Sequence, residues 1–211
     1  MTNSGDSNQD ELFRWADQIP TPLWDDLEAR PPMESATAVN VVFENGAFKV
    51  PLLGFVYGVD PKNRSIIKEG DDAHRVSYQT GIVLLTTLAK SMGVPSSGRM
   101  VTPQELTGGT LFFTGAHTLA TKPLIKRFGN NPEALIVRAM ELGGERVDGA
   151  DLAVRIPALP LLPLYVLLWA GDEESSARAI IGIDDRALFH LDLAGVFALT
   201  NIMVNRLVRN V

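Results

Sequence analysis

The spacing of apolar residues changes twice along the chain, from helical to strand-like and back. Residues 39–67 form the first strand-like stretch, in which two β-rich runs flank Asn45-Gly46, the dipeptide that most strongly favours a two-residue hairpin turn. A further run, GFVYGV, leads to the turn sequence Asp60-Pro61-Lys62-Asn63 and then to SIIK. The pattern therefore predicts an antiparallel meander of three or four strands.

The sequence predicts helices in four places: 73–92, 110–128, 131–143 and 192–209. Apolar residues recur at three- and four-residue spacing in the first and the last, and Asn131-Pro132 gives the third an N-cap followed by a first-turn proline. Gly93 follows the first helix where a C-terminal glycine commonly stands, and Pro123 predicts a break in the second. Asp192 is a typical N-cap for the last helix. Before the second helix, Thr102 and Glu105 have the spacing of a capping box, which indicates a structural role for Glu105.

Residues 151–184 form the second strand-like stretch, with the runs DLAVRIPAL, PLYVLLWAG and RAIIGID. Together with 39–67 they predict an α+β fold, in which a mixed or antiparallel sheet is covered by helices. Near the N-terminus, residues 10–30 suggest two short helices, followed by a linker at Pro31-Pro32. We therefore expect a tail with short helices over 1–32 and a single domain over 33–211.

Composition excludes several classes of function. The chain has 211 residues, a formal net charge of −6 and no cysteine. Its acidic balance argues against nucleic acid as a partner, and the lack of thiols excludes disulfides and Cys-ligated metal centres carried by this chain. The longest apolar stretch, 156–170, is interrupted by prolines and is too short to span a membrane. Because the N-terminus does not resemble a signal peptide, we expect a cytoplasmic protein that binds neither membrane nor nucleic acid.

Several stretches resemble DUF3786, a family of uncharacterised prokaryotic domains. They are GFVYGVD, LLTTLAK, VTPQELTGG, ELGGERVDGADLAVRIPALPLLPLYVLLWAGDEE and the IIGIDD run with its capped terminal helix. The resemblance covers roughly residues 36–208. Ser175-Ser176 depart from the Phe-Pro that tends to follow in the family, and the cysteine-rich segment of some relatives is absent. The resemblance implies a fold family without an activity, so iron–sulfur chemistry is not carried over and any cofactor stays unknown.

Three consecutive carboxylates, Asp172, Glu173 and Glu174, end the long apolar run. In an extended segment alternate side chains face the same way, so Asp172 and Glu174 would converge. Such a pair could bind a hard cation or act as a general acid and base, but acidic residues after a core strand also commonly solvate or cap a turn. Trp169 would pack in the core or line a pocket for a planar or cationic ligand. We take these four residues as candidate ligand-binding residues.

Asp151 and Arg155 complete the candidate site, although we expect them at the opposite end of the same β unit from the three carboxylates. With Asp148 they would also fit an ordinary Asp–Arg pair across a turn. The three histidines are isolated and lack the spacing of a zinc site: His74, His117 and His190. We therefore assign no metal site and identify no catalytic residue.

Three kinds of function fit these observations. We favour a cytoplasmic module without catalytic activity that binds a small molecule or a partner protein. The second is a metal-assisted, carboxylate-based enzyme such as a hydrolase. The third is a structural or oligomerising protein, and a homodimer is one form it would take.

Overall fold

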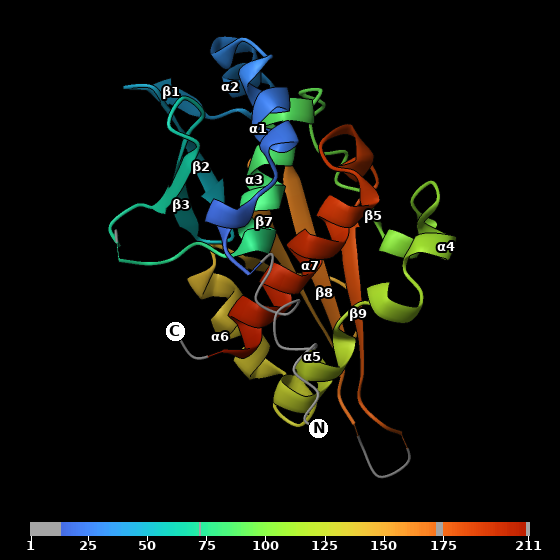
Figure 1. Cartoon of the computed structure of the whole chain (residues 1–211). Helices are drawn as coiled ribbons and strands as arrows, with labels where there is room; N and C mark the ends of the chain where they lie inside the picture. The colour runs from blue at the N-terminus through green and yellow to red at the C-terminus, as the bar shows by residue number, and fades with distance from the viewer. Residues whose placement is uncertain (1–13, 72, 172–174, 210–211) are drawn as a thin grey trace, which may run out of the picture.

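The structure is a computed structural model that describes residues 14–71, 73–171 and 175–209. Its described part contains seven α-helices and two antiparallel sheets, one of four strands and one of five (Figure 1). The predicted α+β class is confirmed. The two strand-rich stretches nevertheless form separate sheets, where we expected one, because each stretch pairs mainly with itself.

The four-stranded sheet is the predicted meander, in the order β1-β2-β3-β4. Its strands are β1 (Val42–Glu44), β2 (Ala47–Leu52), β3 (Phe55–Asp60) and β4 (Ser65–Lys68). Asn45 and Gly46 join β1 to β2 with φ values of 52° and 83°, as a type I′ hairpin turn requires. Leu53 and Gly54 make a second such turn, with φ values of 49° and 83°. These turns set the register that buries one face of the meander.

The five-stranded sheet has the order β5-β9-β8-β7-β6. Its strands are β5 (Met100–Val101), β6 (Glu145–Val147), β7 (Leu152–Leu159), β8 (Leu162–Trp169) and β9 (Arg178–Asp184). The three long strands were predicted from their apolar runs. The edge strands β5 and β6 were not predicted, because two or three residues are too few to show a periodic pattern.

The helices are α1 (Thr21–Glu28), α2 (Pro32–Val39), α3 (Tyr78–Lys90), α4 (Gly109–Phe112), α5 (Thr121–Phe128), α6 (Glu133–Glu141) and α7 (Leu193–Val208). The helix expected over 110–128 is in fact three pieces: α4, the 3₁₀ turn η3 (Gly115–His117) and α5. Gly108, the N-cap of α4, and Gly115, the first residue of η3, have positive φ values of 79° and 56°, which lie outside the right-handed helical region. Pro32 begins α2 where we expected a linker, because proline is well tolerated in the first helical turn.

Helices α3 and α7 lie side by side and cover one face of the five-stranded sheet (Figure 1). The two sheets meet where the Leu53 N–H donates to the Ala158 carbonyl at 3.0 Å. Arg206 of α7 strengthens this junction, because its guanidinium donates to the Leu53 carbonyl at 2.7 Å and to the Tyr57 hydroxyl at 2.7 Å. Burial lowers the pKa of Arg206. In the described ranges no helix has both the length and the apolar character to cross a bilayer.

Candidate functional site

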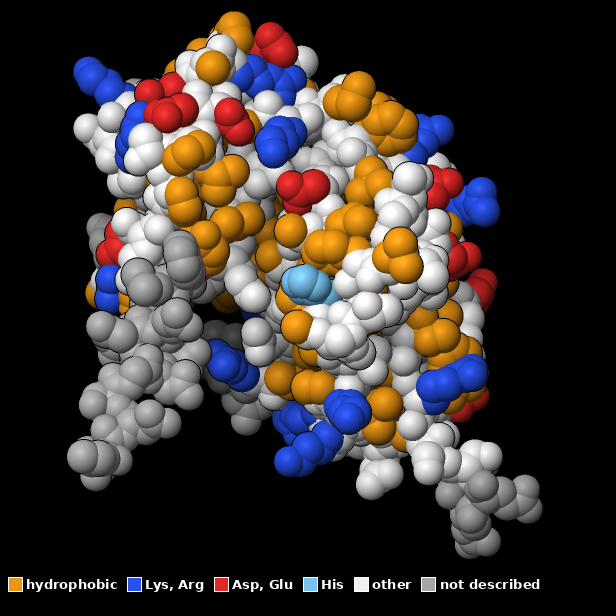
Figure 2. All heavy atoms as spheres, turned by 45° about the vertical axis from the view of Figure 1, so that its right-hand side comes forward, with side chains coloured by type: hydrophobic (Ala, Val, Ile, Leu, Met, Phe, Trp, Pro, Cys, Tyr) orange, Lys and Arg blue, Asp and Glu red, His pale blue; other side chains and the backbone are white. Residues whose placement is uncertain are grey.

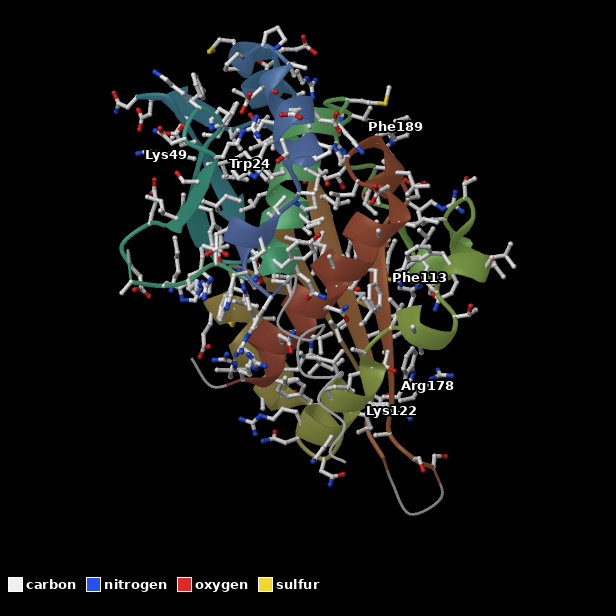
Figure 3. All side chains as sticks on the ribbon, viewed as in Figure 1. Trp24, Lys49, Phe113, Lys122, Arg178 and Phe189 are labelled. Atoms are coloured by element: carbon white, nitrogen blue, oxygen red, sulfur yellow. The ribbon has the colours of Figure 1, made fainter. Side chains whose placement is uncertain are left out.

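The predicted site lies around the hairpin between β8 and β9. Asp172, Glu173 and Glu174 fall outside the described residues. Trp169 is the last residue of β8 and is half-buried rather than enclosed in the core. The guanidinium of Arg178, its partner on β9, lies 4.0 Å from the indole centroid, so a cation covers one face of the ring. Arg178 lies near the base of the hairpin, on the side of α5 and its Lys122 (Figure 3).

Asp151 lies at the same end of the sheet as Trp169, not at the opposite end as we expected. The reason is that β7 runs antiparallel to β8, so Leu152 pairs with Leu168. The Ala170 N–H donates to the Asp151 carboxylate at 3.0 Å, which ties the start of β7 to the end of β8. Arg155 lies further along β7 and pairs with Glu145 at 3.2 Å instead of with Asp151. The structure therefore brings Asp151 to Trp169 and leaves Arg155 apart.

No group of three or more His, Cys, Asp or Glu side chains is positioned to hold a metal ion within the part of the chain that the structure describes. The three consecutive carboxylates of the predicted site are outside that part. The ion-binding hypothesis for them is therefore untested by the geometry.

A buried polar cluster, which the sequence did not single out, lies at the other end of β9. Asp184 is fully buried and accepts hydrogen bonds from the Ser96 hydroxyl at 2.6 Å, the Gly98 N–H at 2.9 Å and the Arg186 N–H at 3.0 Å. Burial alone would raise the pKa of Asp184, but these bonds and the one from the Ser97 N–H outweigh it and lower the pKa. The carboxylate thus holds the 96–98 loop against the sheet as an ionised acceptor.

His190 and Ser91 form the second part of this cluster and are both buried. The Ser91 hydroxyl lies 2.8 Å from His190 Nδ1 and donates to the Ala38 carbonyl at 2.8 Å. A hydroxyl has one proton, so His190 Nδ1 is the donor toward Ser91. Burial lowers the pKa of His190, while the Val94 backbone and the Asp184 carboxylate act in the opposite direction. The ring is therefore neutral near pH 7.

Ser91, His190 and Asp184 are the residue types of a catalytic triad, but the hydrogen bond between Ser91 and His190 runs in the opposite direction. A serine nucleophile is activated when a histidine nitrogen accepts its proton, whereas Ser91 donates that proton to Ala38. Both side chains are also closed off from solvent. The cluster consequently fastens α2, α3 and the start of α7 to one another. Ser91 and His190 are 99 positions apart, so no local sequence signal could have paired them.

An apolar surface is exposed on the arm formed by α4 and η3, which projects beside α7 (Figure 1). We call it the apolar arm and define it by Leu111 and His117, which are exposed, and by Phe112 and the adjoining Phe197 of α7, which are half-buried. Leu111 is 85% exposed. The rings of Phe112 and His117 stack with centroids 4.5 Å apart, and His117 meets Phe197 of α7 edge-on at 5.2 Å. Figure 2 shows hydrophobic side chains gathered across this face of the molecule.

Phe113 anchors the arm to the rest of the protein. Its ring is buried, and it lies between α4 and the body of the molecule (Figure 3). Gly109 packs so tightly that a Cβ there would lie 2.1 Å from the Pro103 carbonyl oxygen. The predicted capping box is confirmed, because the Thr102 N–H donates to the Glu105 carboxylate at 2.7 Å. The run Leu111-Phe112-Phe113 is plain in the sequence, but the fold decides which side chains face solvent: Leu111 is exposed, whereas Phe113 is buried.

A sequence profile of the family described as a domain of unknown function (DUF3786) matches residues 31–206. Comparisons with curated proteins and with solved structures return no match.

Proposed function

The chain belongs to the DUF3786 family, and we propose that it is a cytoplasmic module without catalytic activity that binds a partner protein through the apolar arm. The observation that carries the proposal is the exposure of Leu111, 85%, beside a stack of aromatic rings. Large contiguous apolar surfaces facing water are rare in monomeric proteins and commonly mark binding sites. A partner that covered Leu111 would remove this surface from water and stabilise the complex.

The chemistry of the arm favours an uncharged contact. Residues 106–121 contain no Asp, Glu, Lys or Arg, although most of them are exposed. The cores of protein interfaces are likewise depleted of charge and enriched in aromatic rings. The partner surface expected here is therefore apolar at its centre, with hydroxyl or amide groups that meet the exposed threonines of the arm.

The arm is also held in place before any partner arrives. Phe113 is buried, and the Thr114 hydroxyl donates to the Leu111 carbonyl at 2.9 Å. A surface that is already ordered loses less conformational entropy on binding, which favours affinity. This supports a preformed binding surface over a segment that folds on contact.

Photo-crosslinking in cells tests the proposal. A photoreactive phenylalanine analogue at position 111 should give a discrete product, and mass spectrometry would identify it as another protein or a second copy of this chain. Position 137 is the matched control, because Val137 is 58% exposed but lies on α6, away from the arm (Figure 1). Absence of a product at 111, or the same products at both positions, would contradict the proposal.

A further inference from the structure

A small cavity lies where α3, the end of β7 and the residues before α7 meet. Its lining includes Thr87 and Ser91 of the α3 region, His190, and the turn between β7 and β8. The cavity has a volume of about 10 Å³. This is near the lower limit for a single water molecule, roughly 10–15 Å³. The space is therefore the size of one water molecule and too small for an organic ligand.

Two buried polar atoms belong to residues that line this cavity. His190 Nε2 and Thr87 Oγ1 have no hydrogen-bond partner among the described residues. Buried polar atoms nearly always have a partner, either a protein group or an ordered water. Two such atoms at one small cavity are the condition under which a buried water is expected.

The hydrogen-bonding roles of the two atoms are complementary. Ser91 gives its hydroxyl proton to the Ala38 carbonyl, so the His190 proton resides on Nδ1 and Nε2 is a bare acceptor. The Thr87 hydroxyl has a proton to donate. Between an acceptor and a donor, a water molecule can donate to the first and accept from the second.

We propose that this cavity binds one water molecule, which donates to His190 Nε2 and accepts from Thr87 Oγ1. The chain of hydrogen bonds then runs from the Ala38 carbonyl through Ser91, His190 and the water to Thr87. It satisfies both buried atoms and fixes the tautomer of His190. The water links the last turn of α3 to the segment before α7. This inference is independent of the apolar arm.

Nitrogen-15 NMR of the full chain tests the tautomer. His190 should show a protonated Nδ1 and an unprotonated, hydrogen-bonded Nε2 near pH 7. Cross-relaxation should connect a long-lived water to the Thr87 methyl group and to the His190 ring protons. The alternative acceptor near the ring is the Val94 backbone. A proton on Nε2, directed to that carbonyl, would overturn the proposal, and so would the absence of the water signals.

Two variants of Thr87 test the water directly. Thr87→Val has nearly the same shape but no hydroxyl, and it should lose the water cross-peaks and shift the Nε2 resonance toward that of a free nitrogen. Thr87→Ser keeps the hydroxyl and should retain both signals. Unchanged water signals in Thr87→Val would overturn the proposal. If Thr87→Val does not fold, the measurements on the unaltered chain decide the question alone.

Discussion

Among the described residues, the hydrogen-bond partners of the Asp184 carboxylate are donors: the hydroxyl of Ser96 and the backbone N–H groups of Ser97, Gly98 and Arg186. A carboxylate accepts at both oxygens, whereas an amide would turn an NH₂ group toward these donors. We expect Asp184→Asn to lower the free energy of unfolding by about 2–4 kcal/mol, since hydrogen bonds to charged groups contribute roughly 1.5–3 kcal/mol each. Urea denaturation near pH 7 measures the change.

The adjacent Asp185 provides the control. Its carboxylate accepts from the Ser97 hydroxyl at 2.6 Å and faces Arg99 at 3.8 Å near the surface. Exposed ion pairs contribute little, so Asp185→Asn should cost about 1 kcal/mol or less. If both variants lost the same free energy of unfolding, the burial of Asp184 would not account for its contribution to stability.

The effect of Asp184→Asn should also depend on pH. The folded-state pKa of Asp184 lies below its ordinary value of 3.8. A depressed pKa means that the carboxylate contributes stability above the ordinary value and that this contribution is lost as the pH falls through the lowered one. The unaltered chain and Asp184→Asn should therefore differ most in free energy of unfolding near pH 7, and this difference should shrink below pH 3.8. A difference that stayed constant down to pH 2 would contradict an ionised Asp184.

At the scale of single elements, helix α7 begins at a well-formed N-cap, and most of its residues are buried. The Gly195 N–H donates to Asp192 at 2.8 Å, which confirms the predicted N-cap. Leu199 is completely buried, whereas Phe197 is half-buried and meets the edge of His117. The predicted apolar stripe thus packs inward, and Phe197 lies at its margin.

This difference predicts different costs for two truncations in the same helix. Leu199→Ala should lower the free energy of unfolding by about 2–5 kcal/mol through the cavity it leaves. Phe197→Ala should cost less than the roughly 3–5 kcal/mol of a fully buried phenylalanine, because part of its ring already faces water. Chemical denaturation of both variants compares them. A larger loss for Phe197→Ala would mean that the apolar arm is part of the core.

Elements with a local cause could be predicted from the sequence. Asn45-Gly46 adopts its hairpin turn because of its own backbone preferences, and Asp192 caps α7 through atoms three residues away. Elements that depend on distant partners could not be predicted. Met100 and Val101 form a strand only because β9 lies beside them. Between α4 and η3 the backbone of Thr114 is extended, with φ −126° and ψ 162°, which no periodicity of residues 110–128 reveals.

At the scale of the whole molecule, a few long-range contacts decide how the two sheets are joined. Arg206 reaches from α7 to the turn after β2, 153 positions away at Leu53. The contacts of the candidate site also depend on distant residues and could not be predicted from the sequence. Asp151 lies beside Trp169 because β7 and β8 run in opposite directions. His190 faces Ser91 because α7 packs over α3. Residue types and local spacing carry neither kind of information.

Divalent ions distinguish the proposed binding module from the metal-assisted enzyme. An ion that binds only the folded protein stabilises it by RT ln(1 + [L]/Kd), about 2.7 kcal/mol at a hundredfold excess over Kd. If Asp172 and Glu174 held such an ion, thermal melts with millimolar Mg²⁺, Mn²⁺ or Ca²⁺ would show a clear rise in Tm. The binding module that we propose does not need such an ion, so we expect no specific rise.

The matched control is the double variant Asp172→Asn/Glu174→Gln, which removes two charges but keeps the size of both side chains. The chain has a net charge of −6, so divalent ions will also screen its self-repulsion without a specific site. That general effect should be nearly the same in both proteins. A rise in Tm that occurs in the unaltered chain and disappears in the double variant would contradict the binding-module proposal and place a metal site at the β8–β9 hairpin.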